Sequence, residues 1–209
     1  MTAENQRNVD DDEIAKFSQI ADKWWDKNGE FKPLHDINPL RLNYIDRLAP
    51  LAGKRVLDVG CGGGNTLARM AERVTEGHLV GIDYSETSVE ASRAFNSMLV
   101  AAGRMEILPG SVESLPFSDA HFDKVVTVES FYFWPNPSES LKEVARVVKP
   151  GGTFLLLAEI YERPDLPVGI REKVEAYELT NPTPEEFERL FRAAGFAQVE
   201  THFMDGEYW

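Results

Sequence analysis

A short apolar stretch that runs into a glycine-rich turn is the part of this sequence best suited to chemistry. Residues 56–64 read VLDVGCGGG, and a second apolar stretch further along the chain ends in Gly81-Ile-Asp83. Glycines in such a turn let the backbone approach a ligand closely. An acid at the end of the next parallel strand can accept hydrogen bonds from ribose hydroxyls. The layout therefore predicts a pocket, at the edge of a parallel sheet, for a nucleoside with a charged tail.

The glycine pattern distinguishes between two kinds of nucleoside cofactor. A dinucleotide fingerprint, G-x-G-x-x-G, fits Gly60 and Gly62 but needs a third glycine where this chain has Asn65. The order Asp58-x-Gly60-x-Gly62-x-Gly64 resembles motif I of the class I S-adenosylmethionine (SAM) dependent methyltransferases. The resemblance implies SAM as the cofactor. We expect Asp83 on the ribose and the following helix N-terminus near the carboxylate of the methionine tail.

Further residues complete the expected cofactor pocket. Asp58 either orders the glycine loop or meets the methionine ammonium, and Tyr84 either covers the adenine or is an ordinary surface aromatic. The segment Gly110–Phe117 resembles the family's adenine-binding segment, with Ser111 where an acid is common. The backbone of Ser111 and Val112 would then meet the adenine edge. The resemblance also implies that Val128 lines the cofactor.

The N-terminal third narrows the resemblance. The motifs Asn8-Val-Asp10, Ile14–Phe17, Trp24-Trp-Asp26 and Gly29–Leu42 resemble the ubiquinone-biosynthesis O-methyltransferase family, and Lys149-Pro-Gly-Gly152 also fits. That family methylates a phenolic oxygen on a polyprenyl-substituted ring. The resemblance implies that Arg41, in the Asn-Pro-Leu-Arg motif, binds the SAM carboxylate through its fork of donors.

Beyond Gly64 the sequence resembles generic small-molecule (type 11) methyltransferases. Phe133 stands where the ubiquinone family usually has a histidine, and the insertion after strand five is much shorter. A natural mosaic, an engineered hybrid and simple divergence are all compatible with this pattern. The resemblance therefore does not assign the family's polyprenyl-phenol acceptor to this chain.

The candidates for catalysis are a histidine and a glutamate. Methyl transfer is an in-line displacement that needs positioning, removal of a proton where required, and in principle no metal. His35 would be the base if the N-terminal segment caps the pocket, although a structural role is an alternative. Glu129 follows a predicted strand at the switch point of the sheet and could bind acceptor, order the loop or take a proton. Four aromatic residues would either wall the acceptor pocket or pack the core: Trp24, Trp25, Phe131 and Trp134.

Alternating strands and helices must position these residues. The expected strands cover residues 56–59, 78–83, 105–108, 122–128, 153–159 and 197–203. The expected helices cover 14–24, 40–50 and 65–74, run from a Ser85 cap to Gly103, and begin at Ser138 and at the Thr183 capping box. Residues 30–40 read as irregular because of Pro33 and Pro39. The alternation predicts an α/β class fold, a doubly wound, mostly parallel Rossmann-like sheet.

The domain organisation follows from the same pattern. We expect an N-terminal helical cap segment over residues 1–50 and a SAM-binding domain over 51–209, together one structural domain. The long connection over 160–182 would hold a short helix near the active site. The sequence shows no final strand after residue 203. Either the sequence is cut short there, or the sixth strand lies at an open edge that would invite pairing into a homo-oligomer.

Composition limits the class of acceptor. With 35 acidic against 22 basic residues the net charge is −13, which disfavours nucleic acid. One cysteine, no metal-ligand spacing and a polar start favour a cytoplasmic enzyme without a membrane span or metal. We therefore expect a methyltransferase for a small organic acceptor, with oxygen the favoured atom. The alternatives are carbon or nitrogen methylation, a SAM-binding protein without turnover and, more distantly, a dinucleotide oxidoreductase.

Overall fold

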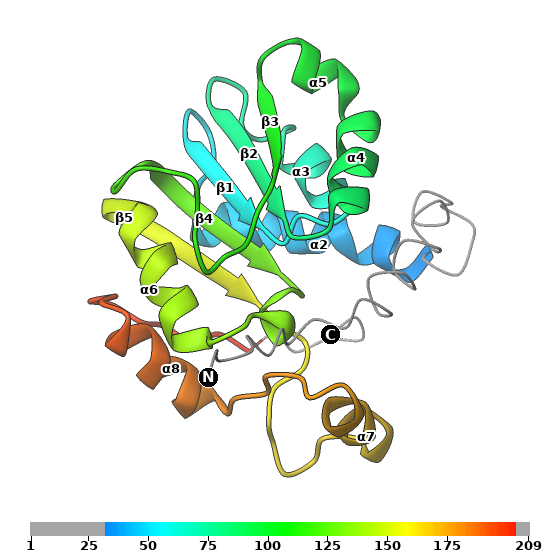
Figure 1. Ribbon diagram of the computed structural model, residues 1–209, viewed down its shortest axis with the longest axis vertical. Helices are drawn as coiled ribbons and strands as arrows, with labels where there is room; N and C mark the ends of the chain where they lie inside the picture. Colours follow the sequence, from blue (N-terminus) through cyan, green and yellow to red (C-terminus); the bar gives the residue numbers. More distant parts are fainter. Residues whose placement is uncertain (1–31, 204–209) are drawn as a thin grey trace, which may run out of the picture.

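Five parallel strands form the centre of the molecule, in the order β3-β2-β1-β4-β5 (Figure 1). The computed structural model describes residues 32–203, with side chains from residue 38 onward. Trp24, Trp25 and the helix predicted over 14–24 lie outside the described residues. The strands are β1 (Arg55–Val59), β2 (His78–Asp83), β3 (Met105–Pro109), β4 (Phe122–Val128) and β5 (Val148–Leu157). The predicted α/β sheet is thus confirmed.

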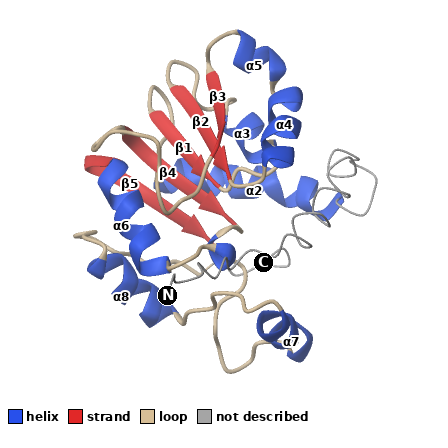
Figure 2. Ribbon diagram, in the orientation of Figure 1, coloured by secondary structure: helices blue, strands red, loops and turns tan. Residues whose placement is uncertain are grey.

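Helices cover both faces of this sheet, as Figure 2 shows. The helices are α2 (Lys32–Leu48), α3 (Asn65–Met70), α4 (Glu86–Phe95), α5 (Ser97–Ala101), α6 (Pro137–Val147), α7 (Val168–Ala176) and α8 (Pro184–Ala193), with a 3₁₀ turn η2 (Phe131–Phe133). Successive strand residues point to opposite faces, and both Val56 and Leu57 are fully buried. Val56 packs with α2, α3 and α4, and Leu57 packs with α6 and α8. A strand buried on both faces is typical of a doubly wound sheet.

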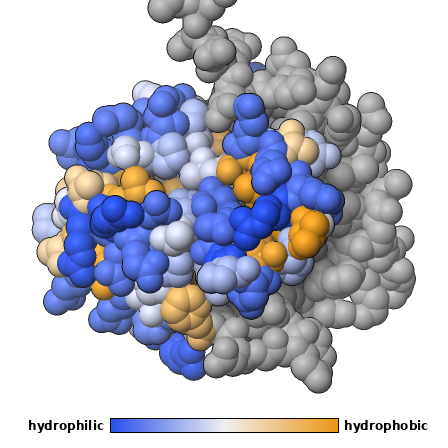
Figure 3. All heavy atoms as spheres, turned by 90° about the horizontal axis from the view of Figure 1, so that it is seen from below, coloured by the Kyte–Doolittle hydropathy of each residue, from blue (hydrophilic) through white to orange (hydrophobic). Residues whose placement is uncertain are grey.

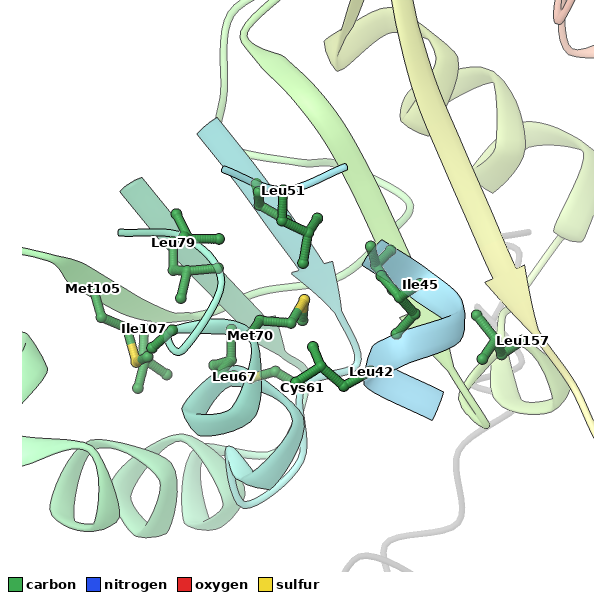
Figure 4. Packing of buried hydrophobic residues seen from close by; sticks show 14 of the residues in the cluster. Leu42, Ile45, Leu51, Cys61, Leu67, Met70, Leu79, Met105, Ile107 and Leu157 are labelled. Carbon is green, nitrogen blue, oxygen red and sulfur yellow. The ribbon is translucent and has the colours of Figure 1, made fainter. Parts of the chain in front are cut away.

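The core under α2 and α3 joins the N-terminal helix to the sheet (Figure 4). Leu42 and Ile45 of α2 meet Leu67 and Met70 of α3 in one buried cluster. Residues 32–48 therefore share their core with the sheet. The division into a cap segment over 1–50 and a domain over 51–209 stays a prediction.

Helix α2 corrects the expected irregular segment over residues 30–40. The helix begins at Lys32 and continues through Pro39 to Leu48. Pro33 lies in the first turn, where no helical N–H is needed, while Pro39 costs one backbone hydrogen bond. Leu42 and Ile45 are 5% and 0% exposed. Their burial offsets the loss at Pro39, so the proline did not mark the start of the helix.

Other boundaries differ from the prediction in ways that local contacts explain. The expected helix over 65–74 ends at Met70, and the one after Ser85 is broken at Asn96 into α4 and α5. The Asn96 side chain donates to the carbonyls of Ser92 and Gly64, at 3.0 and 3.1 Å, which ties the break to the glycine turn. Asn136, rather than Ser138, precedes α6 because Pro137 takes its first position. The Ser85 cap and the Thr183 capping box are confirmed.

The end of the sheet also departs from expectation. Strand β5 covers Val148–Leu157, so it begins five residues before the strand that we expected over 153–159 and ends two residues before it. Residues 197–203 form no strand, although a sixth strand was predicted there. Within residues 32–203, β5 pairs only with β4, so its outer edge has no ladder partner. The 197–203 segment therefore forms no ladder with the free edge of β5.

The described surface is mostly polar. Figure 3 shows hydrophilic residues over most of the face drawn, with smaller hydrophobic patches between them. Within residues 32–203 no helix is both long and apolar enough to cross a membrane.

Candidate cofactor and acceptor site

The glycine turn folds over the carboxyl end of β2. The N–H groups of Gly60 and Cys61 both donate to the Ile82 carbonyl, at 2.8 and 3.1 Å. The Gly62 N–H donates to Asp83 Oδ2 at 2.8 Å. The three predicted cofactor residues Gly60, Gly62 and Asp83 therefore lie together, at the edge where open α/β sheets bind ligands.

Two glycines of the turn are there for different reasons. A side chain at Gly60 would meet Ser130 Cβ at 2.4 Å, so the close approach of the segment between β4 and η2 requires glycine. Gly62 also has a left-handed backbone, with φ +50°, but no atom lies within 4 Å of the place where its Cβ would be. Gly62 thus borders open space above the sheet, which is room for a ligand close to the backbone.

Asp58 lies beneath this turn and is 1% exposed. Burial, and next the charge of Asp83, raise the pKa of the Asp58 carboxyl to about 7. Its Oδ2 atom has no hydrogen-bond partner among the described residues. A buried carboxylate oxygen without a donor is costly, and the ammonium of a methionine tail would supply one. The residues present therefore fit the cation that SAM carries, more than they fit loop capping alone.

Asp83 closes the turn on its other side. Its Oδ1 accepts from the Ser85 N–H at 2.9 Å, and its Oδ2 is held by Gly62. Burial raises the pKa of this carboxyl, while the hydrogen bonds from the Ser85 and Gly62 N–H groups lower it. Each oxygen keeps a second lone pair, so the fixed carboxylate can still accept from a pair of ribose hydroxyls.

The expected adenine side lies beyond Asp83. Tyr84 is 50% exposed, as either of its two interpretations allows. Ser111 Oγ accepts from the Glu113 N–H at 3.2 Å, and Val112 is buried. Gly110, just before Ser111, donates its N–H to the Asp83 carbonyl at 2.9 Å. The segment after β3 is thus adjacent to Asp83, as an adenine site would require.

A second polar cluster lies at the carboxyl ends of β4 and β5. Glu129 follows β4 with a left-handed backbone, φ +56°, which is strained for a residue other than glycine. Its Oε2 accepts from the Tyr132 hydroxyl at 2.7 Å, and its Oε1 accepts from the Glu159 N–H at 3.1 Å. Arg41 of α2 contacts the Glu159 carboxylate and lies 3.4 Å from Glu129 Oε1. One guanidinium is therefore shared by two carboxylates.

This arrangement perturbs the acidity of Glu129. Burial raises the pKa of its carboxyl to about 7, and the Glu159 charge acts in the same direction. The Tyr132 hydroxyl and Arg41 lower the pKa but do not cancel the effect of burial. Burial and the neighbouring Glu129 also raise the pKa of the Tyr132 phenol above its usual range. A carboxyl near pKa 7 can exchange a proton close to neutral pH.

The remaining candidates are placed as follows. Val128, partly buried at the end of β4, borders a small cavity together with Arg41. His35 lies in the first turns of α2, and its side chain is not among those described. Phe131 and Trp134 are 1% and 4% exposed and pack in the core under α6. Their placement supports the core interpretation, so we do not include them in the acceptor site.

Sequence reasoning overlooked Tyr132 and Glu159. Tyr132 lies between the two aromatics Phe131 and Trp134, and Glu159 is the last residue of the strand expected over 153–159, so neither was a site candidate. The predicted sheet could have pointed to both residues, because neighbouring parallel strands bring their carboxyl ends, and the residues that follow them, close together. Among the described residues no group of three His, Cys, Asp or Glu side chains is arranged to hold a metal ion.

The sheet order, the glycine turn and Asp83 define a class I SAM-dependent methyltransferase. A family model described as a methyltransferase domain matches residues 57–156. The ubiquinone biosynthesis O-methyltransferase of Neisseria meningitidis is 40% identical over 97% of this chain and 88% of its own length. The enzyme of the same name from Marinobacter nauticus is 43% identical, over 71% of this chain and 62% of its own. The chain therefore belongs to the ubiquinone biosynthesis O-methyltransferase family.

The fold is also found among solved structures. A chain in the complex between the Haloferax volcanii Trm112 methyltransferase activator and a methyltransferase superposes with a TM-score of 0.71. That chain is 28% identical, and the match covers 86% of this chain and 76% of that one. The Neisseria relative matches 97% of this chain, so the likeness to the ubiquinone family extends well beyond the N-terminal third, to which the sequence analysis had confined it.

Replacing Asp83 with alanine should weaken SAM binding at least tenfold, and on the order of 100-fold if both ribose hydrogen bonds are lost. Two losses contribute to the weaker binding. The variant loses the acceptor for the ribose hydroxyls, and it loses the hydrogen bond from the Gly62 N–H to Asp83 that shapes the turn. Calorimetric titration with SAM and S-adenosylhomocysteine would measure the change. Glu86→Ala, which removes an acid from the adjoining helix start, is the matched control. An unchanged dissociation constant for Asp83→Ala would remove this residue from the ribose site.

Proposed function

We propose that this SAM-dependent methyltransferase methylates a phenolic oxygen of a small acceptor. The observation that carries the proposal is Glu129, a partly buried carboxyl that accepts from the Tyr132 hydroxyl and lies beside Arg41 at the carboxyl edge of the sheet, where burial raises its pKa to about 7. A phenol is a weak acid, with a pKa near 10, so its oxygen becomes a good nucleophile when a base takes the proton. The related enzymes from Neisseria meningitidis and Marinobacter nauticus are O-methyltransferases of ubiquinone biosynthesis, which supports oxygen as the acceptor atom here.

The roles of the cofactor residues follow from their chemistry. SAM, when bound, supplies an activated methyl group on a sulfonium that is a good leaving group. We propose that Gly62 leaves room for SAM beside the backbone, that Gly60 lets the turn pack against Ser130, that Asp83 accepts from the ribose and that Asp58 faces the ammonium. Tyr84, Ser111, Val112 and Val128 would border the adenosine. Arg41 stays a candidate for the carboxylate, although its contacts to the two glutamates favour a part in the acceptor site.

Glu129 would act on the acceptor. The hydroxyl of the acceptor would donate to a Glu129 oxygen and pass its proton to that carboxylate. The phenolate oxygen would then take the methyl group that bound SAM supplies, and the sulfur–methyl bond would break to leave S-adenosylhomocysteine. Arg41 keeps Glu129 partly ionised near neutral pH, because its positive charge lies 3.4 Å from Oε1. The backbone strain at Glu129 fits a residue held in place for function. His35 remains a second candidate base.

A cleft beside the glutamates suits an apolar substituent of the acceptor. It has a volume of about 580 Å³ and follows the free edge of β5, with Glu159 among its lining residues. Apolar side chains from β5, α2 and α8 line it, including Leu155, Leu157, Tyr44, Phe187 and Phe191. We infer that a phenol with a hydrocarbon substituent would place its ring near Glu129 and its substituent in this cleft.

The test is an acceptor comparison with SAM labelled in the methyl group. A catechol, the same catechol with a prenyl substituent, and an aromatic amine of similar shape would be compared. We expect O-methylated products, identified by NMR, and at least tenfold higher kcat/KM for the prenylated catechol. A methylated amine with no methylated phenol would overturn the proposal.

The setting of the reaction is also inferred. A net charge of −13 repels a polyanion, so we infer a small-molecule acceptor rather than nucleic acid. The single buried thiol, Cys61, is consistent with work in a reducing cytoplasm.

A further inference from the structure

Tyr132 contacts both ends of the long connection between β5 and α8. At the start of the connection, the Ile160 N–H donates to the Tyr132 hydroxyl at 2.9 Å. At its end, the Thr180 N–H donates to the Tyr132 carbonyl at 3.0 Å. The same hydroxyl donates to Glu129 Oε2 at 2.7 Å. One side chain therefore joins the reaction carboxylate to the connection.

The two ends of the connection are also tied to each other. The Glu162 N–H donates to the Pro182 carbonyl at 3.1 Å, and Asn181 Nδ2 donates to Glu162 Oε2 at 3.3 Å. Arg171, on the helix α7 between them, donates to both oxygens of Glu162 at 2.9 and 3.0 Å. These bonds link α7 to the base of the connection, so we expect the whole segment to move as one piece.

Helix α7 itself packs weakly against the body of the protein. None of its residues is buried, and Val168 is 73% exposed. Figure 1 shows α7 at the lower end of the molecule, away from the sheet. A segment with little buried apolar surface opens at low free energy, unless hydrogen bonds at its base hold it. The contacts of Tyr132 are placed at that base.

We propose that Tyr132 is a positioning residue that couples the α7 connection to Glu129. With the connection in place, Ile160 fixes the Tyr132 oxygen so that its proton points to Glu129. If the connection moves away, Glu129 loses the Tyr132 hydrogen bond and, through Glu159 next to Ile160, the N–H bond at its other oxygen. The position of α7 would thus control how the reaction carboxylate is held. The role of Glu129 rests on the proposed function, whereas the coupling does not.

The groups that face Glu129 determine whether loss of the Tyr132 hydroxyl raises or lowers the pKa of Glu129. They are Tyr132 from η2, Arg41 from α2 and Glu159 from the end of β5. The Tyr132 hydroxyl donates to the charged form of Glu129 and so lowers its pKa. Tyr132→Phe keeps the ring in its buried site and removes only the hydroxyl. Glu129 should then titrate higher, by about one pH unit if the bond contributes what charged hydrogen bonds usually do.

Two measurements on the whole chain test the coupling without any acceptor. The first is a ¹³C NMR titration of the Glu129 carboxyl, assigned by its absence in Glu129→Gln. The second is the rate of tryptic cleavage after Arg171 and Lys173 in α7, with cleavage after Arg192 in α8 as internal reference. Tyr161→Phe is the matched control, because its hydroxyl accepts from Arg163 on the same connection but does not contact Glu129.

We expect Tyr132→Phe to raise the titration midpoint of Glu129 and to speed cleavage in α7 by roughly tenfold, in line with the loss of one hydrogen bond at the base. Tyr161→Phe should change neither by a comparable amount. An unchanged titration of Glu129 in Tyr132→Phe, or equal cleavage rates in both variants, would overturn the coupling. Both results are independent of whether a phenol is methylated, so failure here is distinct from failure of the proposed function.

Discussion

Glutamine in place of Glu129 is expected to lower kcat/KM for a phenolic acceptor by roughly 10²–10⁴-fold, the usual contribution of a general base. Glutamine has the same shape and can still accept from the Tyr132 hydroxyl, so the fold should persist. It cannot take a proton, which is the property that the proposed reaction needs. SAM affinity should stay within a few-fold, because Glu129 is proposed to act on the acceptor.

The pH profile makes this prediction sharper. The pKa of Glu129 is about 7, so wild-type kcat/KM should rise with pH as the carboxyl loses its proton around that value. The rise should be absent in Glu129→Gln. Glu159→Gln is the control, because Glu159 shares Arg41 but is more exposed than Glu129, at 41% against 26% of the side chain. Wild-type rates in Glu129→Gln would show that the phenol reacts without this base, and His35→Ala would then be examined.

The second large effect is expected at Asp58 and has opposite signs for stability and binding. Asp58→Asn should stabilise the cofactor-free protein at pH 8 and weaken SAM binding. The folded pKa of about 7 lies above the ordinary value of 3.8, so the folded state binds the Asp58 proton more tightly than the unfolded state does. The stability contributed by this proton is present at acid pH and is lost as pH rises from about 4 through 7.

The magnitude follows from the same pKa difference. One pKa unit corresponds to about 1.4 kcal/mol, so a shift of this size amounts to about 4 kcal/mol above pH 7. Asparagine carries no charge to bury, and its stabilising effect should therefore be small near pH 4 and largest at pH 8. Urea unfolding at the two pH values, with Glu76→Gln as an exposed control, would measure it. An equal change in stability at both pH values would contradict the assigned pKa.

The charge of Asp58 should favour SAM binding. An ammonium beside the carboxylate would offset the hydration that the carboxylate loses on burial. We expect Asp58→Asn to bind SAM at least tenfold more weakly at pH 8. The wild-type dissociation constant should also fall as pH rises from 6 to 8, since binding then no longer has to displace a proton. An asparagine variant with wild-type affinity would leave Asp58 a structural residue.

The strands were the most predictable part of this molecule. The strands predicted over 78–83 and 122–128 have these bounds in the structure, because each contains a short run rich in apolar residues, at 79–82 and 125–128, next to turn residues. The glycine turn and Asp83 were predictable as a pair for a related reason: one motif places them on adjacent parallel strands. Both the strand positions and the pairing of the glycine turn with Asp83 can thus be predicted from short stretches of sequence.

What depended on contacts between distant residues was not predictable. Helix α2 passes through Pro39 because Leu42 and Ile45 find a core built mostly by other elements. Residues 197–203 have a strand-like sequence, yet no hydrogen-bonded neighbour among the described residues. Arg41 and Glu159 are 118 positions apart, and only the packing of α2 beside the end of β5 brings them together. No spacing rule in a single sequence connects such a pair.

The burial of Cys61 gives the molecule an internal reporter. The thiol is 6% exposed in the glycine turn, and burial raises its pKa well above the usual range. It is also the chain's single cysteine. A thiol reagent can therefore modify the protein at one place, and only when the turn opens. The labelling rate would measure how often the turn opens in solution, and its slowing by SAM would report cofactor occupancy without any spectroscopic tag.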